Sequence, residues 1–441
     1  MPHRSIMFTI FIAAFALAAS STVSAQQKIG KHHTLAATLE TVQWGWLDPN
    51  EPPKLKVNSG DTVSIETMMH AHDKVKPGIT MDEIVALRKA NPGGGPHSMT
   101  GPIYVEGAEP GDVLEVRILK IVPKPFAVNF NLPGKDFPTI GALAPEMPDG
   151  FVRFMLLDMK NRTAEFKPGI TIDLKPFPGT LAVGIDPNDP SPRKGGVKDN
   201  PMAPVSTLRP WKNGSNMDIN ELQAGSTVFL PVFLKGGLIW TGDSHCRQGN
   251  GEVNLTALEC SFKEIVIQPI VRKDLKLEWP RIETKNSWIT VGIDRDLNKA
   301  LEILKTETTA FLMEQRKIGK EQAEKLMLAS WDCRVSQVVD VNKGLHCFSA
   351  KNPRERRKVE ALPEQENRTY LVTVARDADL NKAMDDAAWA MIELLQKEKS
   401  LSRLDAYGLA SMVMDCRLAA PLGPQKAVHC LLPKSTWVAS R

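Results

Sequence analysis

The sequence predicts a mainly β protein of the α+β class, in which a β-sandwich or barrel comes first and helix–strand units follow. Within the first 285 residues, short runs alternate between apolar and polar residues, and Gly60-Asp61, Gly111-Asp112 and Gly225-Ser226 supply turns before three of them. Further along, apolar residues recur at helical spacing from Leu297 to Leu312 and from Glu321 to Trp331. This second pattern occurs twice, so we expect two similar helix–strand units at the end of the chain.

The composition is that of an ordinary globular protein. Of the 441 residues, 42% are hydrophobic and 24% are charged, which suits two or three packed units. Lysine and arginine number 55 against 51 aspartate and glutamate residues, which gives a net charge of +4. Because this balance produces no strong positive field, we expect no nucleic-acid partner.

The N-terminus has the pattern of a secretory signal peptide. Met7 to Ala19 is apolar except for Thr9, follows the basic residue Arg4, and precedes the small residues Val23-Ser24-Ala25. This apolar stretch is shorter than the roughly 20 residues that cross a bilayer. We therefore expect residues 1–25 to be removed, a periplasmic or secreted protein, and no membrane association after cleavage. A retained N-terminal anchor is the alternative.

Six cysteines fall into three pairs of equal spacing. The pairs are Cys246 with Cys260, Cys333 with Cys347, and Cys416 with Cys430. Members of each pair are 14 positions apart, and an even number of cysteines in an exported chain predicts disulfides between them. In the second pair, a strand over Arg334–Val341 and a turn at Asn342–Gly344 would bring the two cysteines together. Buried free thiols are the alternative.

The C-terminal part of the chain contains an internal repeat in which three segments recur 83 positions later. The matching segments are Leu297–Ala300 and Leu380–Ala383, Asp332–Arg334 and Asp415–Arg417, and His346-Cys347 and His429-Cys430. We interpret them as a tandem duplication. The predicted copies are 288–353 and 369–434, and they follow a β-rich core at 26–287.

The segment from Gly242 to Glu252 has the highest density of residues that carry chemistry. Asp243 and His245 point to the same face of an extended strand, where they could bind a metal or act as an acid–base pair. Glycines after them allow the backbone to turn, so that Glu252 returns towards the same face. The alternative is a glycine-rich hairpin whose Asp and His only cap turns.

Residues of three further segments could join this face. His97 lies in a glycine-rich segment, Asp218 precedes a predicted strand, and His70 and His72 would share one face if their segment were extended. A single histidine is more often a structural or surface residue than a ligand, so spacing alone leaves both interpretations open for each.

Four motifs occur in the order found in the acetamidase/formamidase family, which the sequence resembles between residues 35 and about 350. The motifs are Gly101–Asp112, Asn216-Met217-Asp218 with Leu230-Pro231-Val232, Gly242-Asp243-x-His245-x-x-Gln248-Gly249-x-Gly251-Glu252, and Asp332–Asp340. The resemblance implies a β-sandwich-based fold with appended helices. It also implies hydrolysis of the carbon–nitrogen bond of small aliphatic amides, such as formamide or acetamide, with a divalent metal, zinc or calcium.

The resemblance also implies the roles of individual residues. The expected metal ligands are Asp243, His245, Asp218 and His97. The expected catalytic residues are Glu252, His245, Gln248 and His97, with Glu252 as the general base on water. The partner is a small amide, and a homo-oligomer is compatible with the sequence.

One departure from the family pattern leaves alternatives open. The family usually has Asp where this chain has Asn250, so we expect a change in the affinity or choice of metal. A periplasmic metal- or ligand-binding protein on the same scaffold, with catalysis lost or altered, is therefore an alternative function. A second alternative makes Cys246 a thiolate nucleophile, although a strand would point it away from His245.

Overall fold

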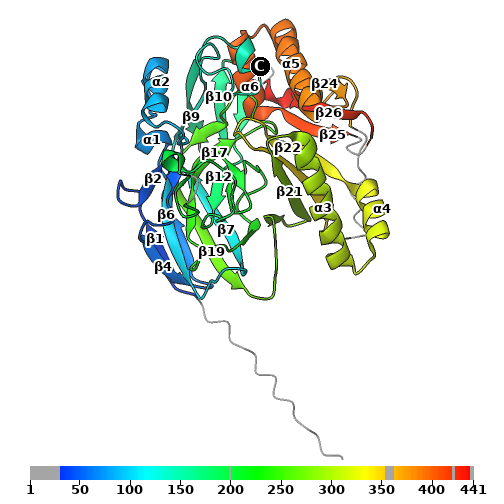
Figure 1. Ribbon diagram of the computed structural model, residues 1–441. Helices are drawn as coiled ribbons and strands as arrows, with labels where there is room; N and C mark the ends of the chain where they lie inside the picture. The colour runs from blue at the N-terminus through cyan, green and yellow to red at the C-terminus, as the bar shows by residue number, and fades with distance from the viewer. Residues whose placement is uncertain (1–29, 198–199, 353–361, 420–422, 438–441) are drawn as a thin grey trace, which may run out of the picture.

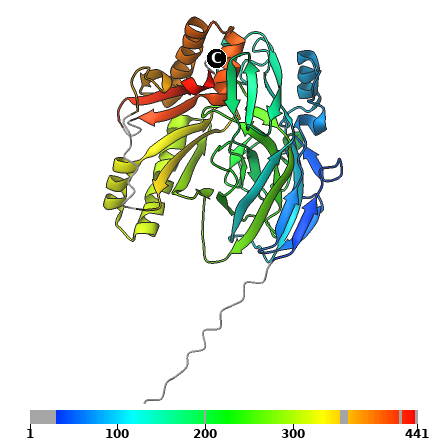
Figure 2. The ribbon, with the colours of Figure 1, turned by 180° about the vertical axis from the view of Figure 1, so that it is seen from behind.

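Two twelve-stranded sheets carry most of the β structure (Figures 1 and 2). The computed structural model describes residues 30–197, 200–352, 362–419 and 423–437, so the predicted signal peptide lies outside them. The first sheet, called here the long sheet, has the order β1 (His32–Leu35), β5 (Thr62–Ile65), β19 (Phe262–Arg272), β7 (Val113–Pro123), β16 (Thr227–Pro231), β20 (Arg281–Glu283), β21 (Ser287–Asp294), β23 (Lys343–Ala350), β22 (Asp332–Gln337), β25 (Asp415–Ala419), β26 (Lys426–Pro433) and β24 (Tyr370–Asp377).

The second sheet, called here the site sheet, packs against the core part of the long sheet. Its main path is β11 (Ile170–Asp173), β10 (Thr163–Lys167), β9 (Phe151–Asp158), β8 (Phe126–Asn131), β18 (Leu258–Cys260), β17 (Ile239–Arg247), β12 (Phe177–Ala182), β15 (Gly214–Asn216) and β14 (Pro210–Trp211). β6 (Ser98–Glu106) pairs with β17 and also with β2 (Val42–Trp44) and β4 (Leu55–Asn58), while β3 (Trp46–Leu47) and β13 (Val205–Ser206) form a small separate pair.

One hydrophobic core joins the two sheets. Val63, Val116 and Ile265 of the long sheet belong to the same buried cluster as Phe177 and Leu258 of the site sheet. Alternating side chains fill the space between two sheets in this way in a β-sandwich. The prediction of a mainly β, sandwich-based fold is confirmed.

Six helices accompany the sheets in the described residues. They are α1 (His70–Asp73), α2 (Met81–Ala90), α3 (Leu297–Arg316), α4 (Lys320–Ser330), α5 (Leu380–Lys399) and α6 (Arg403–Val413), with short 3-10 turns at Ala144–Glu146, Lys194–Gly196 and Lys434–Thr436. The helices predicted from Leu297 and from Glu321 are confirmed within a few residues. None of the described helices is long and apolar enough to span a bilayer.

α3 and α5 begin and pack in the same way. Asp296 and Asp379 cap their first turns by accepting a hydrogen bond from the backbone two residues later. In α3, Leu297, Leu301 and Leu304 are buried at helical spacing against the long sheet. Full burial of each leucine contributes about 2 kcal/mol, so this packing holds the helix in place.

Two groups of elements follow the core and share one order: strand, two helices, and two further strands. The first is β21-α3-α4-β22-β23 and the second is β24-α5-α6-β25-β26. They lie side by side at one side of the core, olive to yellow and orange to red in Figure 1, and β22 pairs with β25. The duplication itself remains a prediction, but both groups extend the long sheet of the core without a break.

The three predicted disulfides are present. The Cα atoms are 6.0 Å apart in Cys246–Cys260, 4.2 Å in Cys333–Cys347 and 4.0 Å in Cys416–Cys430. The predicted strand over 334–341 is shorter than expected and ends at Gln337. The reason is local: Oε1 of Gln337 accepts hydrogen bonds from the backbone N–H groups of Val339 and Asp340, which closes a turn there.

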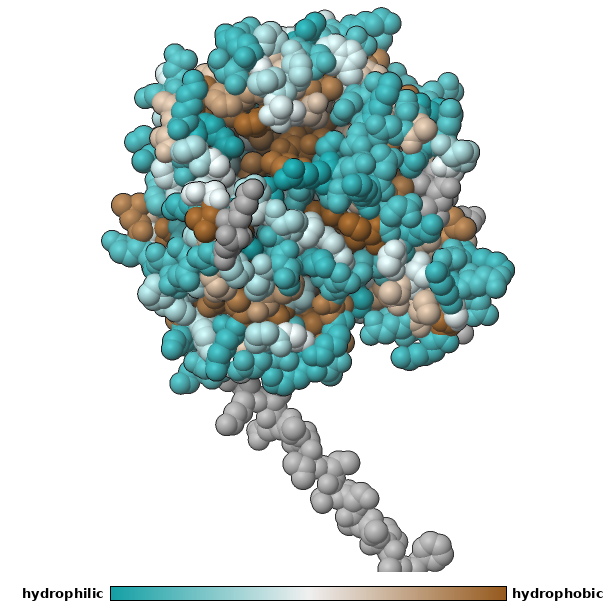
Figure 3. Space-filling model, viewed as in Figure 1, coloured by the Kyte–Doolittle hydropathy of each residue, from teal (hydrophilic) through white to brown (hydrophobic). Residues whose placement is uncertain are grey.

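Most of the face shown in Figure 3 is hydrophilic, although hydrophobic residues gather in a hollow in its upper half.

Candidate active site

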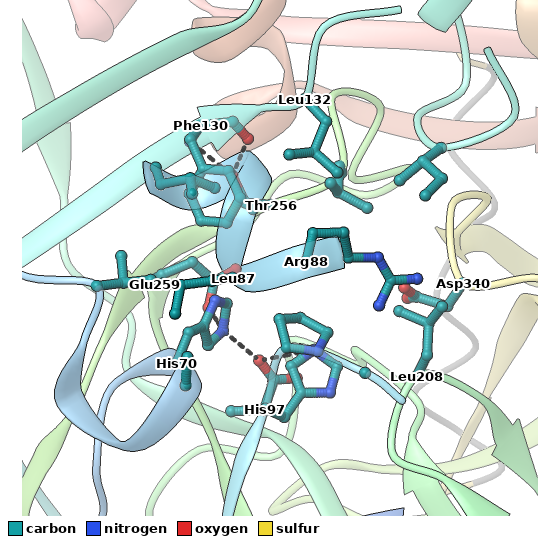
Figure 4. A pocket seen from close by; sticks show the side chains of 18 of the residues that line it. His70, Leu87, Arg88, His97, Phe130, Leu132, Leu208, Thr256, Glu259 and Asp340 are labelled. Carbon is teal, nitrogen blue, oxygen red and sulfur yellow. Dashed lines mark hydrogen bonds and ion pairs between the residues drawn. The ribbon is translucent and has the colours of Figure 1, made fainter. Parts of the chain in front are cut away.

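Eight buried acidic and histidine side chains lie together at the site sheet and form what we call the His/Asp/Glu cluster. Its members are His70, His97, Asp218, Asp243, His245, Glu252, Glu259 and Asp340. Each has at most 5% of its surface exposed. Figure 4 shows how His70, His97, Glu259 and Asp340 surround one pocket. The cluster contains every metal ligand predicted from the sequence.

β17 and β18 supply the centre of the cluster. His245 Nε2 lies 3.2 Å from Asp243 Oδ1 and 3.2 Å from Glu259 Oε2. His245 and Glu259 are direct cross-strand partners. The next residue on each strand is a cysteine, and the Cys246–Cys260 disulfide links the same two strands. Strand pairing and the disulfide therefore fix the imidazole between two carboxylates.

Two further imidazoles approach the same carboxylates. His70 Nε2 lies 3.4 Å from Asp243 Oδ1 and 3.3 Å from Glu259 Oε2, and His97 Nε2 lies 3.5 Å from Asp243 Oδ1. The expectation that His70 and His72 share an extended face is wrong, because α1 is a tight turn in which Ala71 and His72 have positive φ. His72 instead packs against Trp44.

Gln248 orients His245. Nε2 of Gln248 donates to the carbonyl oxygens of Asp218 and Ser336, at 3.0 and 3.1 Å. Its Oε1 therefore faces His245 and accepts a hydrogen bond from Nδ1 at 2.9 Å. Nδ1 therefore carries a proton, and Nε2 faces the cluster, where burial opposes the charge but Glu259 and Asp243 outweigh it and raise the pKa of His245 well above its ordinary value. A bound cation would take the place of the proton on Nε2.

Loops carry the remaining carboxylates. Asp218, Glu252 and Asp340 form one of the groups whose ligand atoms lie within 4.8 Å of one another. Asp218, Asp243 and Glu252 have φ values of 51°, 49° and 48°, which is the left-handed region that non-glycine residues rarely adopt. Backbone strain of this kind gathers at functional sites, because surrounding structure must hold it in place.

The electrostatics of the cluster disfavour its full negative charge. Burial raises the pKa of Asp218 to about 8, and the nearby charge of Asp243 adds to the effect. Burial and Asp218 also raise the pKa values of Glu252 and Asp340 well above their ordinary range. Burial opposes the charge on Asp243 as well, but His97, His245 and His70 hold its pKa well below the usual value. Carboxyl groups this close ionise together only if a cation compensates them.

The donor set fits a divalent cation. Among the described residues, no N–H group donates to either oxygen of Asp218, to Oε2 of Glu252 or to Oδ2 of Asp340, and Asp218 and Asp340 can hydrogen-bond only to each other, when one of them is protonated. A buried carboxylate oxygen without a partner is costly, and a metal ion would satisfy all three residues. Imidazole together with carboxylate is the ligand chemistry of zinc and related ions.

Gly179 on β12 keeps the space beside these ligands open. A Cβ atom at this position would lie 2.6 Å from Asp218 Oδ1, 2.6 Å from Asp243 Oδ2 and 2.6 Å from His245 Cε1. These distances are far below ordinary contact, so any side chain at Gly179 would displace the ligand atoms.

The cluster forms one end of a pocket with about 730 Å³ of empty space, including the part that is open to solvent. The outer wall is apolar, and its residues include Ile84, Leu87, Leu132, Ile140, Leu208 and Leu255. Arg88 of α2 also lines the wall and donates a hydrogen bond to the carbonyl of Gly94. An apolar cavity with polar groups gathered at one place is typical of a small-molecule site.

Comparison with known proteins identifies the family. The model of the acetamidase/formamidase family matches residues 31–194 and 195–292, which is more than half of the chain. The chain belongs to the acetamidase/formamidase family. The match ends within β21, before α3 begins.

The relatives found have low sequence identity to this chain. An acetamidase from Mycolicibacterium smegmatis is 30% identical over 36% of this chain and 49% of its own length. A formamidase from Methylophilus methylotrophus is 26% identical over 46% of this chain and 58% of its own. This chain therefore spans about half the length of the curated relatives it matches. The crystal structure of an acetamidase from Bacillus halodurans has a TM-score of 0.62 and 25% identity, and the likeness covers 72% of this chain and 97% of that one.

In this family member, Asn250 lies outside the His/Asp/Glu cluster. Its Nδ2 donates to Asp415 Oδ1 at 2.7 Å, and its Oδ1 accepts from Asn220 at 3.3 Å. The side chain is not among the candidate ligands, because the glycine-rich turn directs it towards β25, and the expected change in metal affinity or choice stays a prediction. An Asp at this position would face the carboxylate of Asp415.

Cys246 is not a free thiol. It forms the disulfide with Cys260 and is fully buried, and no described cysteine is free. A nucleophile must be available as a thiolate, so the alternative of a cysteine amidase is wrong.

Two members of the cluster, Glu259 and Asp340, are not predicted as site residues by any motif or spacing described above, and His70 is not distinguished there from His72. A signal for Glu259 was present, since the predicted Cys246–Cys260 disulfide places the residues that precede each cysteine near each other across two strands. Asp340 lay within a recognised motif but was interpreted as part of a strand. No local pattern distinguishes His70, because a turn with positive φ decides where it points.

Proposed function

We propose that this family member hydrolyses the carbon–nitrogen bond of small aliphatic amides to a carboxylate and ammonia. Family membership supports hydrolysis of linear amides. The single observation that carries the proposal for this chain is the buried His/Asp/Glu cluster at the end of an apolar pocket. An amide could place its carbonyl at the cluster and its alkyl group against the apolar wall.

A divalent cation belongs to the proposal. Asp218, Asp243 and His245 would hold it, because their ligand atoms lie within 4.8 Å of one another and border the space kept open by Gly179. Zinc suits this mixture of imidazole and carboxylate better than calcium, which takes oxygen ligands. When bound, such a cation polarises a carbonyl group and lowers the pKa of water.

His97 fits the role of a ligand better than that of an oxyanion donor. Its Nδ1 lies 3.2 Å from the carbonyl oxygen of Thr207, which can only accept, so Nδ1 carries the proton. Burial lowers the pKa of His97 to about 4, so the ring is neutral at neutral pH. Its Nε2 then offers a lone pair to the cluster.

Glu252 is the proposed general base. Burial and Asp218 raise its pKa well above the ordinary range, which makes it a stronger proton acceptor once a bound cation allows it to ionise. Oε2 of Glu252 has no partner among the described residues, so it is available to a water molecule. After attack, the same carboxyl group would pass its proton to the departing ammonia.

Ammonia release tests the proposal. Mature, oxidised protein should release ammonia from acetamide or formamide, lose this activity after removal of metal, and regain it with zinc. Glu252→Gln should reduce kcat at least 100-fold, the range in which general bases contribute, while circular dichroism and Tm stay close to those of the wild type. Activity that survives metal removal, or an unchanged rate in Glu252→Gln, would contradict the mechanism.

Two other expectations remain proposals. Export to the periplasm or beyond is supported by the three disulfides, which persist in oxidising compartments. The alternative of a binding protein without catalysis rested on the additional C-terminal repeat and on Asn250, whose side chain lies outside the cluster. Metal binding without release of ammonia from any amide of up to six carbons would favour that alternative.

A further inference from the structure

A second pocket lies where the core meets both C-terminal groups of elements. The residues that follow β17 form one wall, β22 and β25 form others, and the pocket has about 760 Å³ of empty space including its opening to solvent. It is separate from the His/Asp/Glu cluster, although Gln248, which orients His245, borders it. Asp415 and Arg417 of the second group line it, so the pocket depends on that group.

Positive charge exceeds negative charge in this pocket. Four cationic residues line it, Lys175, Arg247, Arg334 and Arg417, against two carboxylates, Glu221 and Asp415. Both carboxylates already have partners. Arg334 Nη1 lies 3.2 Å from Glu221 Oε1, and Arg417 Nε donates to Asp415 Oδ2 at 2.7 Å.

Arg247 and Lys175 form no direct ion pair in the described residues, and the carboxylates of Asp173 and Asp415 act on both only from a longer distance. Within the described part of the chain, neither side chain forms an ion pair within 4.0 Å or a hydrogen bond, and Nε of Arg247 is buried. The positive charge of Arg247, together with burial, lowers the pKa of Lys175, so the two cations repel each other. An unsatisfied charged donor in such a place destabilises the folded chain, and a bound anion would satisfy it.

We propose that this pocket binds a small oxyanion, a carboxylate or a phosphate, through Arg247 and Lys175. The planar guanidinium group of Arg247 matches two oxygens of such an anion, and the ammonium group of Lys175 adds a charged hydrogen bond at the rim. This site is independent of the proposed amidase activity. It gives the second C-terminal group a role, because that group supplies one wall of the site.

Calorimetric titration of the full mature chain tests the site. Inorganic phosphate and acetate serve as separate probes, at low ionic strength so that screening does not hide the interaction. Metal is first removed, so that neither probe can bind a cation in the His/Asp/Glu cluster. Binding of phosphate alone, acetate alone or both to the wild type supports the site and identifies its preferred anion.

Three variants locate the binding. Arg247→Gln should weaken binding about tenfold or more, because charged hydrogen bonds of this kind contribute on that scale. Lys175→Gln should weaken binding by a smaller factor, and it tests the site independently because this exposed residue can change without harm to the fold. Lys397→Gln is the matched control, since it removes one charge from an exposed position on α5 and should leave affinity unchanged.

Two results would overturn the proposal. One is a wild-type protein that binds neither probe at millimolar concentration. The other is binding that is equally tight in the wild type, Lys175→Gln and Lys397→Gln proteins, which would place the anion elsewhere on the chain.

Discussion

Gly179→Ala should damage the candidate metal site while leaving most of the fold intact. The added Cβ would lie 2.6 Å from Asp218 Oδ1, from Asp243 Oδ2 and from His245 Cε1, whereas ordinary contacts begin at 3.4 Å. These atoms must therefore move by about 0.8 Å, the difference between the two distances. Misplacement on the scale of 1 Å costs roughly 100-fold in activity, and overpacking of this kind costs about 1–3 kcal/mol in stability.

Three measurements check this expectation together. Zinc affinity by competition with a chelator and ammonia release from acetamide should each fall about 100-fold, while Tm should fall by only a few degrees. Gly319→Ala is the matched control, because a Cβ there meets nothing within 4 Å and its φ is not positive. If Gly179→Ala binds zinc and turns over substrate within twofold of the wild type, the cluster does not hold the metal as inferred.

Three further predictions concern other parts of the molecule. Glu259→Gln should weaken zinc binding 10- to 100-fold in a chelator competition, because it removes a charge 3.2 Å from His245 Nε2; unchanged affinity would exclude Glu259 from the site. Burial raises the pKa of Asp385 from 3.8 to about 6, so the folded state loses stability as the pH rises from 3.8 to about 6, and the full penalty persists above that. Asp385→Asn should therefore increase the free energy of unfolding, measured in urea, by about 1 kcal/mol at pH 8, an amount reduced because the side chain is partly exposed. The same substitution should change it little at pH 4, and an equal effect at pH 4 and pH 8 would refute this reasoning. Replacing Cys416 and Cys430 by alanine should cost about 3 kcal/mol in the same assay, as expected for a short disulfide loop, and an unshifted midpoint would contradict it.

The fold class was predictable because its signals are local. Alternating runs bounded by glycine turns predicted strands, helical spacing predicted α3 and α4, and equal spacing of cysteines predicted the three disulfides. The order of strands in the sheets was not predictable. β21 and β23 pair across two helices, and β22 pairs with β25 from the other C-terminal group, so these contacts depend on the folded chain.

Part of the candidate site was predictable because some of its residues lie close together in the sequence. Asp243, His245 and Glu252 lie within one short segment, where strand alternation and glycine turns limit their positions. Glu259 enters the cluster through cross-strand register, and Asp340 enters through a turn closed by its neighbour Gln337. Neither effect leaves a periodic pattern in the sequence.

The pairing of β22 with β25 determines whether the backbone groups along the outer side of β22 are hydrogen-bonded. Because β22 continues into β25, β26 and β24, the second C-terminal group covers hydrogen-bonding groups that β22 would otherwise expose. A chain cut after residue 352 would end its sheet at β22, with backbone donors and acceptors unpaired along that strand. Such strands recruit strands from other molecules, so the shortened protein should self-associate and precipitate during refolding. We therefore expect the last group of elements to protect the rest of the chain against aggregation.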